Sequence, residues 1–331
     1  MKTELLFEEY REDVLECLHH GMVCVVDKNG IVASVGSPDW TCFYRSCSKP
    51  IQMLPVLTHN LDKKYGLTQE ETAIFSGSHF ADADHIAVLT SILEKTGLDE
   101  SRMIMNPTYP NRASVKDRLI SEGMPPRKLY HNCSGKHLAM MLLARELGEP
   151  VEQYWVRESK TQQEILKTIS QLTDVPVQDI RIGVDGCGVP VYAVPFHAIA
   201  TSYLRLMRPE LITDDSLREA VTRNMEALHA NPNMISGAGN LSTYLTANPD
   251  LFGKDGAMGV YTMGIRSMGL GIVFKIMDGS QAEFASGVIH ILKELGYDPA
   301  VVDELSKAFP DIIVNDNNET AGYRKAVFSL K

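Results

Sequence analysis

A serine and a lysine three residues apart are the pair in this chain best suited to chemistry. They are Ser46 and Lys49, in a segment that continues directly into Pro50. If the segment begins a helix, residues three apart lie on one face, about 5–6 Å apart at Cβ, so the hydroxyl and the amine can meet. A lysine becomes a base for a serine only when burial or a neighbouring cation lowers its pKa. The alternative is a helix start capped by Ser46, with Lys49 in solvent.

Four other segments bring reactive side chains together. In Ser76-Gly77-Ser78-His79, the glycine permits close backbone approach, so that Ser78 can sit exposed at a strand end; an ordinary Ser/Gly turn is the alternative. Gly253-Lys254-Asp255-Gly256 leads into a predicted strand and is similar to the Lys-Thr-Gly strand of penicillin-recognising enzymes, although it also suits a surface hairpin.

The other two segments contain cysteines. His131-Asn132-Cys133-Ser134-Gly135-Lys136-His137 opens a strongly apolar helix, with Ser134 as the expected cap. A helix N-terminus offers free N–H groups and partial positive charge, which lower a cysteine pKa and favour a bound carboxylate. Gly183-Val184-Asp185-Gly186-Cys187-Gly188 reads as a constrained loop with exposed backbone, or as a turn with Asp185 in a common turn role.

The composition excludes several classes of function. A net charge of −10 without any basic stripe argues against nucleic-acid binding. No apolar run approaches the ~18 residues that span a bilayer, and the acidic N-terminus lacks the apolar region of a signal peptide, so a cytoplasmic location without membrane attachment is predicted. The 6 scattered cysteines are expected to be free thiols or metal ligands, and the usual zinc-protease and P-loop motifs are missing.

The periodicity predicts an α/β (α+β) protein. A hairpin is expected around Lys28-Asn29-Gly30, and strands at 258–265 and 270–278, with an edge strand at 325–330. Helices are expected at 51–61, 84–97, 134–148, 159–173, 196–207, 216–229 and 281–296. Residues 1–331 are predicted to form a single compact chain of two interleaved parts: an α/β part from 20–75 plus 181–331, and a mostly helical part from 76–180.

Taken together, these motifs resemble the rhizobial-type L-asparaginases, the third structural class of that enzyme. The resemblance runs from about residue 20 to the C-terminus, and its most specific elements are the Asn-Cys-Ser-Gly-Lys-His run at 132–137 and Asp185-Gly186-Cys187. It implies a fold similar to serine β-lactamases, penicillin-binding proteins and glutaminases, with an antiparallel sheet from both chain ends and an inserted helical part. It also implies a homodimer that hydrolyses L-asparagine to L-aspartate and ammonia.

The resemblance also implies a set of site residues. The two catalytic serine–lysine pairs fall on Ser46/Lys49 and Ser78/Lys254. A labile zinc site, which the chemistry does not require, falls on Cys133, Lys136 and Cys187. The residues expected to contact the amino-acid substrate are Arg45, Asn132, His137 and Asp185. Ser46 is preferred as the nucleophile because helix geometry fixes its lysine, whereas Lys254 must arrive through the fold.

One segment departs from the family pattern. The family usually has Gly-x-Gly-Arg-x-Cys-Thr, or Asp in place of the Cys, where this chain has Gly237-Ala238-Gly239-Asn240-Leu241-Ser242-Thr243. If that arginine reads a substrate carboxylate, Asn240 weakens or redirects specificity. A glutaminase or broader amidase therefore stays an alternative, as does an amino-acid-binding protein that has lost turnover. A penicillin-recognising enzyme would need a Ser-x-Asn element between the two lysines, which is not evident.

Overall fold

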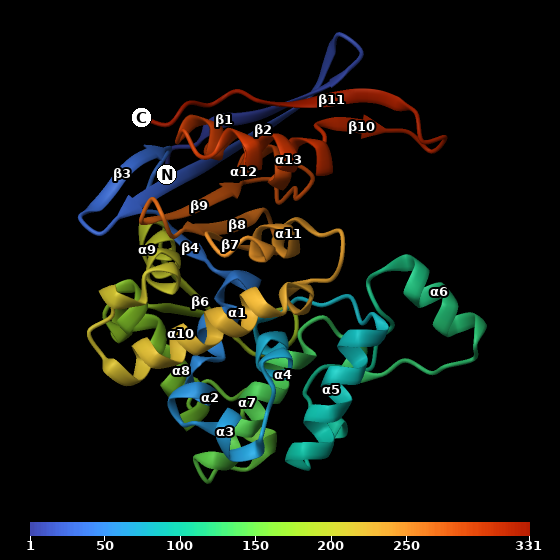
Figure 1. The fold of residues 1–331 in the computed structure, drawn as a ribbon, viewed down its shortest axis with the longest axis vertical. Helices are drawn as coiled ribbons and strands as arrows, with labels where there is room; N and C mark the ends of the chain where they lie inside the picture. Colours follow the sequence, from blue (N-terminus) through green and yellow to red (C-terminus); the bar gives the residue numbers. More distant parts are fainter.

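The computed structural model describes residues 1–331 as a sheet layer above a helical layer (Figure 1). An eight-stranded sheet has the order β10-β11-β1-β2-β9-β8-β7, with β3 paired to β2, and every pair is antiparallel. Its strands are β1 (Glu4–Arg11), β2 (Val14–Asp27), β3 (Gly30–Val35), β7 (Leu251–Gly256), β8 (Val260–Ile265), β9 (Leu270–Ile276), β10 (Ile312–Val314) and β11 (Thr320–Ala326). Strands from both chain ends therefore meet in one antiparallel sheet, as predicted.

Both faces of this sheet are covered. Alternation along β2 sends Met22, Cys24 and Val26 into the larger core, on the side of α9 (Phe196–Met207). The intervening Val23 and Val25 join a smaller core under α12 (Phe284–Glu294) and α13 (Pro299–Ala308). A strand buried on both faces reads as a continuous apolar run, which is why 22–26 lacks a polar alternation.

Of the remaining helices, α11 lies beside β7, and the others form the lower layer in Figure 1, with α6 projecting from it. They are α1 (Lys49–Gln52), α2 (Leu54–Thr58), α3 (Leu61–Tyr65), α4 (Gln69–Ala73), α5 (Ala83–Thr96), α6 (Ala113–Ser121), α7 (Ser134–Glu146), α8 (Lys160–Thr173), α10 (Asp215–Ala230) and α11 (Leu241–Ala247). A small sheet of β4 (Thr41–Phe43), β6 (Pro190–Pro195) and β5 (Arg181–Val184) lies among them. No helix combines the length and apolar content needed to cross a bilayer.

Most predicted elements are present, and the differences have local causes. The helix expected at 51–61 is divided into α1, α2 and α3, because Pro55 interrupts its hydrogen-bond ladder and Asn60 is left-handed at φ 54°. Strand β11 is not an edge strand: it lies between β10 and β1. The N-terminal hairpin of β1 with the first half of β2 was not predicted, because its side chains are largely exposed and its charges hide the alternation.

Gly135 allows the first turn of α7 to pack closely against the 3-10 turn at Ile74–Ser76. A Cβ on Gly135 would lie 2.3 Å from the carbonyl oxygen of Ile74. Because α7 begins with the polar run at 132–137, this approach sets the distance between that run and the neighbouring Gly77-Ser78 segment.

We therefore expect Gly135→Ala to lower the free energy of unfolding by about 1–3 kcal/mol, the usual penalty for overpacking. Gly186→Ala is the matched control, since nothing lies within 4 Å of its added Cβ. Denaturant unfolding of both variants measures the difference. Equal stability of the two variants would contradict the close packing of α7.

Candidate active site

The side chain of Lys49 is fully buried at the junction of three segments. Its Nζ lies 2.8 Å from the Gly77 carbonyl oxygen, 2.8 Å from Ser78 Oγ and 3.1 Å from the Asn132 carbonyl oxygen. Lys49 begins α1 and Asn132 precedes α7. Ser78, predicted to be exposed at a strand end, instead follows the 3-10 turn at Ile74–Ser76 and is buried. Carbonyl and hydroxyl oxygens, without a carboxylate, therefore surround this amine.

These surroundings favour the neutral amine. Burial lowers the pKa of Lys49, and the nearby positive charge of Lys254 lowers it further, against an opposing effect of Cys133. A neutral amine has two N–H bonds, which suit the two carbonyl oxygens, and its lone pair then faces the hydroxyl of Ser78. That is the hydrogen-bond pattern of a general base.

Ser46 precedes Lys49 by three residues but is not hydrogen-bonded to its amine. The residue sits in a 3-10 turn, Arg45–Ser48, is partly exposed, and its hydroxyl makes no hydrogen bond. The predicted Ser46–Lys49 contact is therefore replaced in the structure by Lys49–Ser78, because all three bonding positions of the amine are used by partners outside its own helix. Arg45, next to Ser46, has a positive φ of 51°, which is uncommon for a non-glycine residue and often marks a functional site.

Lys254 also has a partner other than the predicted one. This lysine is fully buried in β7, and its Nζ donates to the Asp255 carbonyl oxygen at 2.9 Å and to Asp255 Oδ1 at 2.8 Å, rather than to Ser78. Asp255 also accepts from Ser242 Oγ at 2.9 Å. Burial opposes ionisation of Asp255, but Lys254 and Ser242 lower its pKa, so a buried ion pair stands beside the Lys49 amine. The role of Asp255 was not predicted, because Lys254-Asp255 also reads as a hairpin.

Two residues predicted to contact substrate form an ion pair with each other. Arg45 Nε donates to Asp185 Oδ1 at 3.0 Å, and the two Nη groups of Arg45 make no hydrogen bond. The second oxygen, Asp185 Oδ2, lies 3.6 Å from Lys136 Nζ. Burial raises the pKa of Asp185, but Lys136 and Arg45 lower it more, so the carboxylate is charged. A guanidinium and a carboxylate thus stand side by side next to Ser46.

The residues of the predicted metal site converge. Cys133, Lys136 and Cys187 are all buried, and Lys136 Nζ lies 3.2 Å from Cys187 Sγ. Donation by Cys187, together with the charges of Lys49 and Lys136, holds the pKa of Cys133 well below its usual value despite burial. Burial would lower the pKa of Lys136, but the two sulfur atoms and Asp185 raise it. Two soft sulfur donors fit zinc, whereas Lys136 fits only after it loses a proton.

His137 does not face a substrate. It is fully buried, with Nδ1 2.7 Å from the Tyr154 hydroxyl, and burial holds its pKa well below the usual value. A direct substrate contact is therefore not supported, because the residue after Lys136 is rotated about 100° around α7, into the core.

Ser134 is the first helical residue rather than the cap, which is Cys133. Its hydroxyl donates to the Leu129 carbonyl oxygen at 3.0 Å and lies 2.8 Å from Nε2 of His79. The fully buried His79 in turn accepts from the Ala81 amide at 3.1 Å, which assigns the hydrogen to Nε2. Sequence reasoning did not assign His79 a role. The bridge ties the loop that carries Ser78 to the start of α7.

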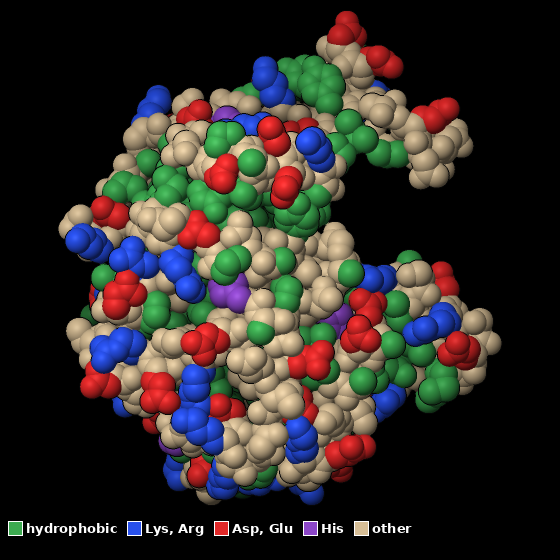
Figure 2. Space-filling view, viewed as in Figure 1, with side chains coloured by type: hydrophobic (Ala, Val, Ile, Leu, Met, Phe, Trp, Pro, Cys, Tyr) green, Lys and Arg blue, Asp and Glu red, His purple; other side chains and the backbone are tan.

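Ser78 and Asn132 line a cavity of about 420 Å³. Its other walls are the segments at 239–242 and 281–285, with Phe80, Asn111, Asp255, Tyr261 and Phe309. Figure 2 shows the deep notch between the sheet layer and the region of α5 and α6. Asn240, at the position of the family arginine, lies in this wall and caps α11 by accepting from the Ser242 amide at 3.0 Å. Ser46, Arg45 and Asp185 are not part of this lining.

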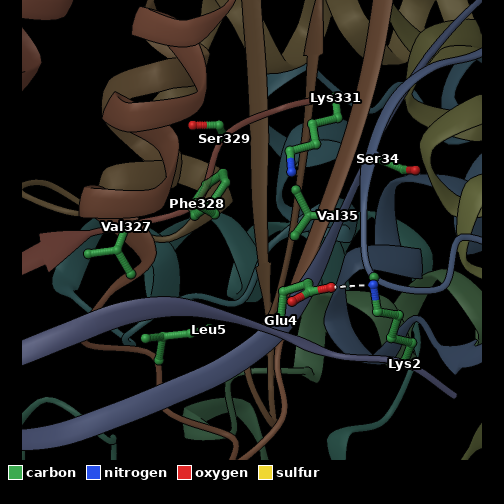
Figure 3. Close-up of a pocket in the computed structure, with 10 residues that line it drawn as sticks. Lys2, Glu4, Leu5, Ser34, Val35, Val327, Phe328, Ser329 and Lys331 are labelled. Carbon is green, nitrogen blue, oxygen red and sulfur yellow. Dashed lines mark ion pairs between the residues drawn. The ribbon is translucent and has the colours of Figure 1, made fainter.

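A second hollow, of about 480 Å³, lies at the chain termini and holds no activated nucleophile. It is lined by residues such as Glu4, Ser34, Val35 and Phe328, with the Lys2–Glu4 ion pair at its rim (Figure 3). Lys2 is exposed, and no buried base accompanies the serines there. The chemistry therefore belongs to the Lys49 cluster.

Comparisons with known proteins identify the family of the chain. A family model described as L-asparaginase II matches residues 7–326. A search of curated proteins finds no match. Among solved structures, the chain is similar to a class C β-lactamase from Rhodobacter sphaeroides, with 15% identity over 82% of this chain and 95% of that one, at a TM-score of 0.43. It is also similar to a probable glutaminase from Bacillus subtilis complexed with 6-diazo-5-oxo-L-norleucine. The identity is 12% over 87% of this chain and 83% of that one, at a TM-score of 0.33.

The lowered pKa of Lys49 makes stability depend on pH in a defined direction. The folded chain binds fewer protons at Lys49 than the unfolded chain, so stability rises with pH between the lowered folded pKa and the ordinary lysine pKa of about 10.4. In Lys49→Met this contribution is missing. The free energy of unfolding of the wild type, relative to that of the variant, should therefore increase as pH rises from 7 to 9. Urea unfolding of both proteins across this range measures it. A difference that is constant or moves the other way would show that Lys49 is charged in the folded state.

Proposed function

Because this chain belongs to the L-asparaginase II family and is a hydrolase acting on amides, we propose that it releases ammonia from L-asparagine through a serine acyl-enzyme. The observation that carries the proposal is the buried Lys49 amine, with a lowered pKa, 2.8 Å from Ser78 Oγ and one helical turn from Ser46. General acid–base work by a group tuned in this way contributes about 10²–10⁴-fold to a rate.

Ser46 is the proposed nucleophile. It is partly exposed, its hydroxyl is free, and it adjoins the Arg45–Asp185 pair that would hold the substrate. Its Oγ attacks the carbon of the side-chain amide while Lys49, after exchanging its hydrogen bond with Ser78 for one with Ser46, takes the hydroxyl proton. The negative charge on the tetrahedral oxygen is stabilised by backbone N–H groups.

Ser78 is the proposed proton relay between Lys49 and the leaving group. The hydrogen bond from Lys49 Nζ to Ser78 Oγ lets the amine return its proton through the serine hydroxyl to the amide nitrogen, which departs as ammonia. Water then attacks the ester carbon and loses its proton to Lys49, and the acyl bond breaks as Ser46 recovers a proton. The product is L-aspartate. Burial lowers the pKa of Lys49, and the positive charge of Lys254, which is paired with Asp255, lowers it further.

The amino-acid head group is proposed to bind at Arg45 and Asp185. The two free Nη groups of Arg45 suit a bidentate contact with the α-carboxylate, and Asp185 suits the α-ammonium. Asn132, in the wall of the Ser78 cavity, is positioned to contact the same substrate. These contacts would place the side-chain amide near Ser46, the residue after Arg45.

A zinc ion, if bound, would be held by Cys133, Cys187 and Lys136, the last after loss of its proton. It would fix the loop that carries Asp185 through its neighbour Cys187, and no step above requires it. Because the ion would hold a loop and take part in no catalytic step, we propose a regulatory or structural role for the two thiols rather than a catalytic one.

A glutaminase or broader amidase is the second candidate, favoured by one observation. Asn240 lines the Ser78 cavity at the position of the family arginine, so one cationic contact there is missing. The two activities would use the same catalytic residues and differ in the space left for the substrate.

We expect purified protein to release ammonia from asparagine faster than from glutamine, and Ser46→Ala and Ser78→Ala each to lower that rate by at least about 10²-fold. Ser48→Ala is the matched control, because its hydroxyl only donates to the Arg45 carbonyl oxygen at 2.8 Å. A coupled ammonia assay measures all four proteins. Full activity in Ser46→Ala would move the nucleophile to Ser78 or refute the scheme, and faster release from glutamine would establish the second candidate.

The head-group contact can be tested with succinamate, which is asparagine without its α-ammonium. Loss of a charge-assisted contact of about 1.5–3 kcal/mol should make wild-type kcat/KM for succinamate about 10–150-fold lower than for asparagine. Asp185→Asn should lower kcat/KM for asparagine and leave that for succinamate nearly unchanged. Equal losses for both substrates would mean that Asp185 acts on the structure of the site and not on the ammonium.

A further inference from the structure

A cluster of ligand-type side chains lies away from the catalytic residues, on the face of the sheet that α12 covers. Glu9 of β1, His19 of β2 and Glu283, which precedes α12, bring their ligand atoms within 4.8 Å of one another. Neighbouring strands position them: Phe7 pairs with His19 and Glu9 pairs with Cys17, so Glu9 and His19 share a face.

The buried polar atoms of this cluster lack partners. Glu283 is 1% exposed, and neither of its carboxylate oxygens accepts a hydrogen bond. Nε2 of His19 is likewise buried without a partner. A carboxylate buried in this way costs several kcal/mol unless a cation or donors compensate it. The nearest cationic side chain, Arg324, donates to Glu9 Oε1 at 2.9 Å and lies 3.7 Å from Glu283.

The spacing of these atoms suits a shared ion better than direct hydrogen bonds. His19 Nε2 lies 3.6 Å from Glu283 Oε1 and 3.8 Å from Glu9 Oε2, too far for hydrogen bonding. Ligand atoms about 2.1 Å from a tetrahedral zinc lie about 3.4 Å from one another. The separations seen here are close to that value.

The other nitrogen of His19 is oriented as in metal sites. Nδ1 lies 2.6 Å from Asp278 Oδ2, in the loop after β9. Donation from Nδ1–H to a carboxylate leaves Nε2 unprotonated and facing the two glutamates, which is the carboxylate–histidine–metal arrangement. The three carboxylates and Arg324 together leave two net negative charges, which a divalent cation would balance.

We propose that Glu9, His19 and Glu283 bind a divalent transition-metal ion such as zinc, oriented by Asp278. One imidazole and two carboxylates are a donor set that zinc accepts. The ion joins the N-terminal hairpin to the start of α12. Because Ala282 and Phe284 line the Ser78 cavity on either side of Glu283, the ion also anchors that cavity wall. Its role is structural, and hydrolysis proceeds without it.

The test counts zinc per chain after chelator treatment and reloading, in His19→Gln, Glu283→Gln and the control His20→Gln. His20 is the exposed next residue of β2. We expect the control to bind one zinc more per chain than either test variant, and zinc to raise its melting temperature by more than theirs. Glu283→Gln keeps the experiment decisive if His19→Gln does not fold. Asp278→Asn should bind about 10–100-fold more weakly.

The same comparison in a Cys133→Ser background separates this site from the thiols near Asp185. The difference of one zinc between His20→Gln and the test variants should persist there. If His19→Gln and Glu283→Gln hold as much zinc as His20→Gln in both backgrounds, or if no protein binds zinc at this position, the cluster is an ion-pair network only and the metal site is refuted.

Discussion

The active site depends on the burial of an amine that has no carboxylate partner. Lys49 is surrounded by two carbonyl oxygens and one hydroxyl, and desolvation lowers its pKa further than its neighbours raise it. Much of the surrounding structure serves this placement. The α1 helix delivers the lysine, Gly135 lets α7 approach the turn before Gly77, and His79 bonds to Ser134 to hold the two loops together.

The pKa of a second buried lysine, in the first turn of α7, is shifted in the opposite direction. Lys136 faces two sulfur atoms and Asp185, and its pKa is raised. The pKa values of two lysines with the same intrinsic basicity are thus shifted in opposite directions by burial and by their partners, a common way to divide acid and base roles. The cation also holds Asp185 beside Arg45, so the same separation prepares the head-group site.

The sequence predicts the secondary structure, and which residues lie near the site, better than it predicts which of those residues hydrogen-bond to one another. Helices with clear periodicity and glycine ends, such as α5 and α7, were located well. Ser78 and Asn132 contact the Lys49 amine, and Lys254 lies close enough to lower its pKa. Which serine contacts Lys49 could not be predicted, because a long side chain selects partners from any packed segment. Asp255 and His79 were missed because each looks like part of a turn in sequence. To predict that His137 faces the core, one must know how the buried helix α7 is oriented. To predict the hairpin of β1 and β2, one must know that β1 pairs with β11.

The central claim is that the Lys49 amine is neutral in the resting protein at working pH. Nitrogen-15 NMR of a protein labelled at its lysine side chains, with Lys49→Met to assign the resonance, measures this directly. Titration with pH should show the Lys49 Nζ resonance changing well below the ordinary lysine pKa of about 10.4. A titration at or above that value would contradict the account, because the amine could then not accept a proton from a serine.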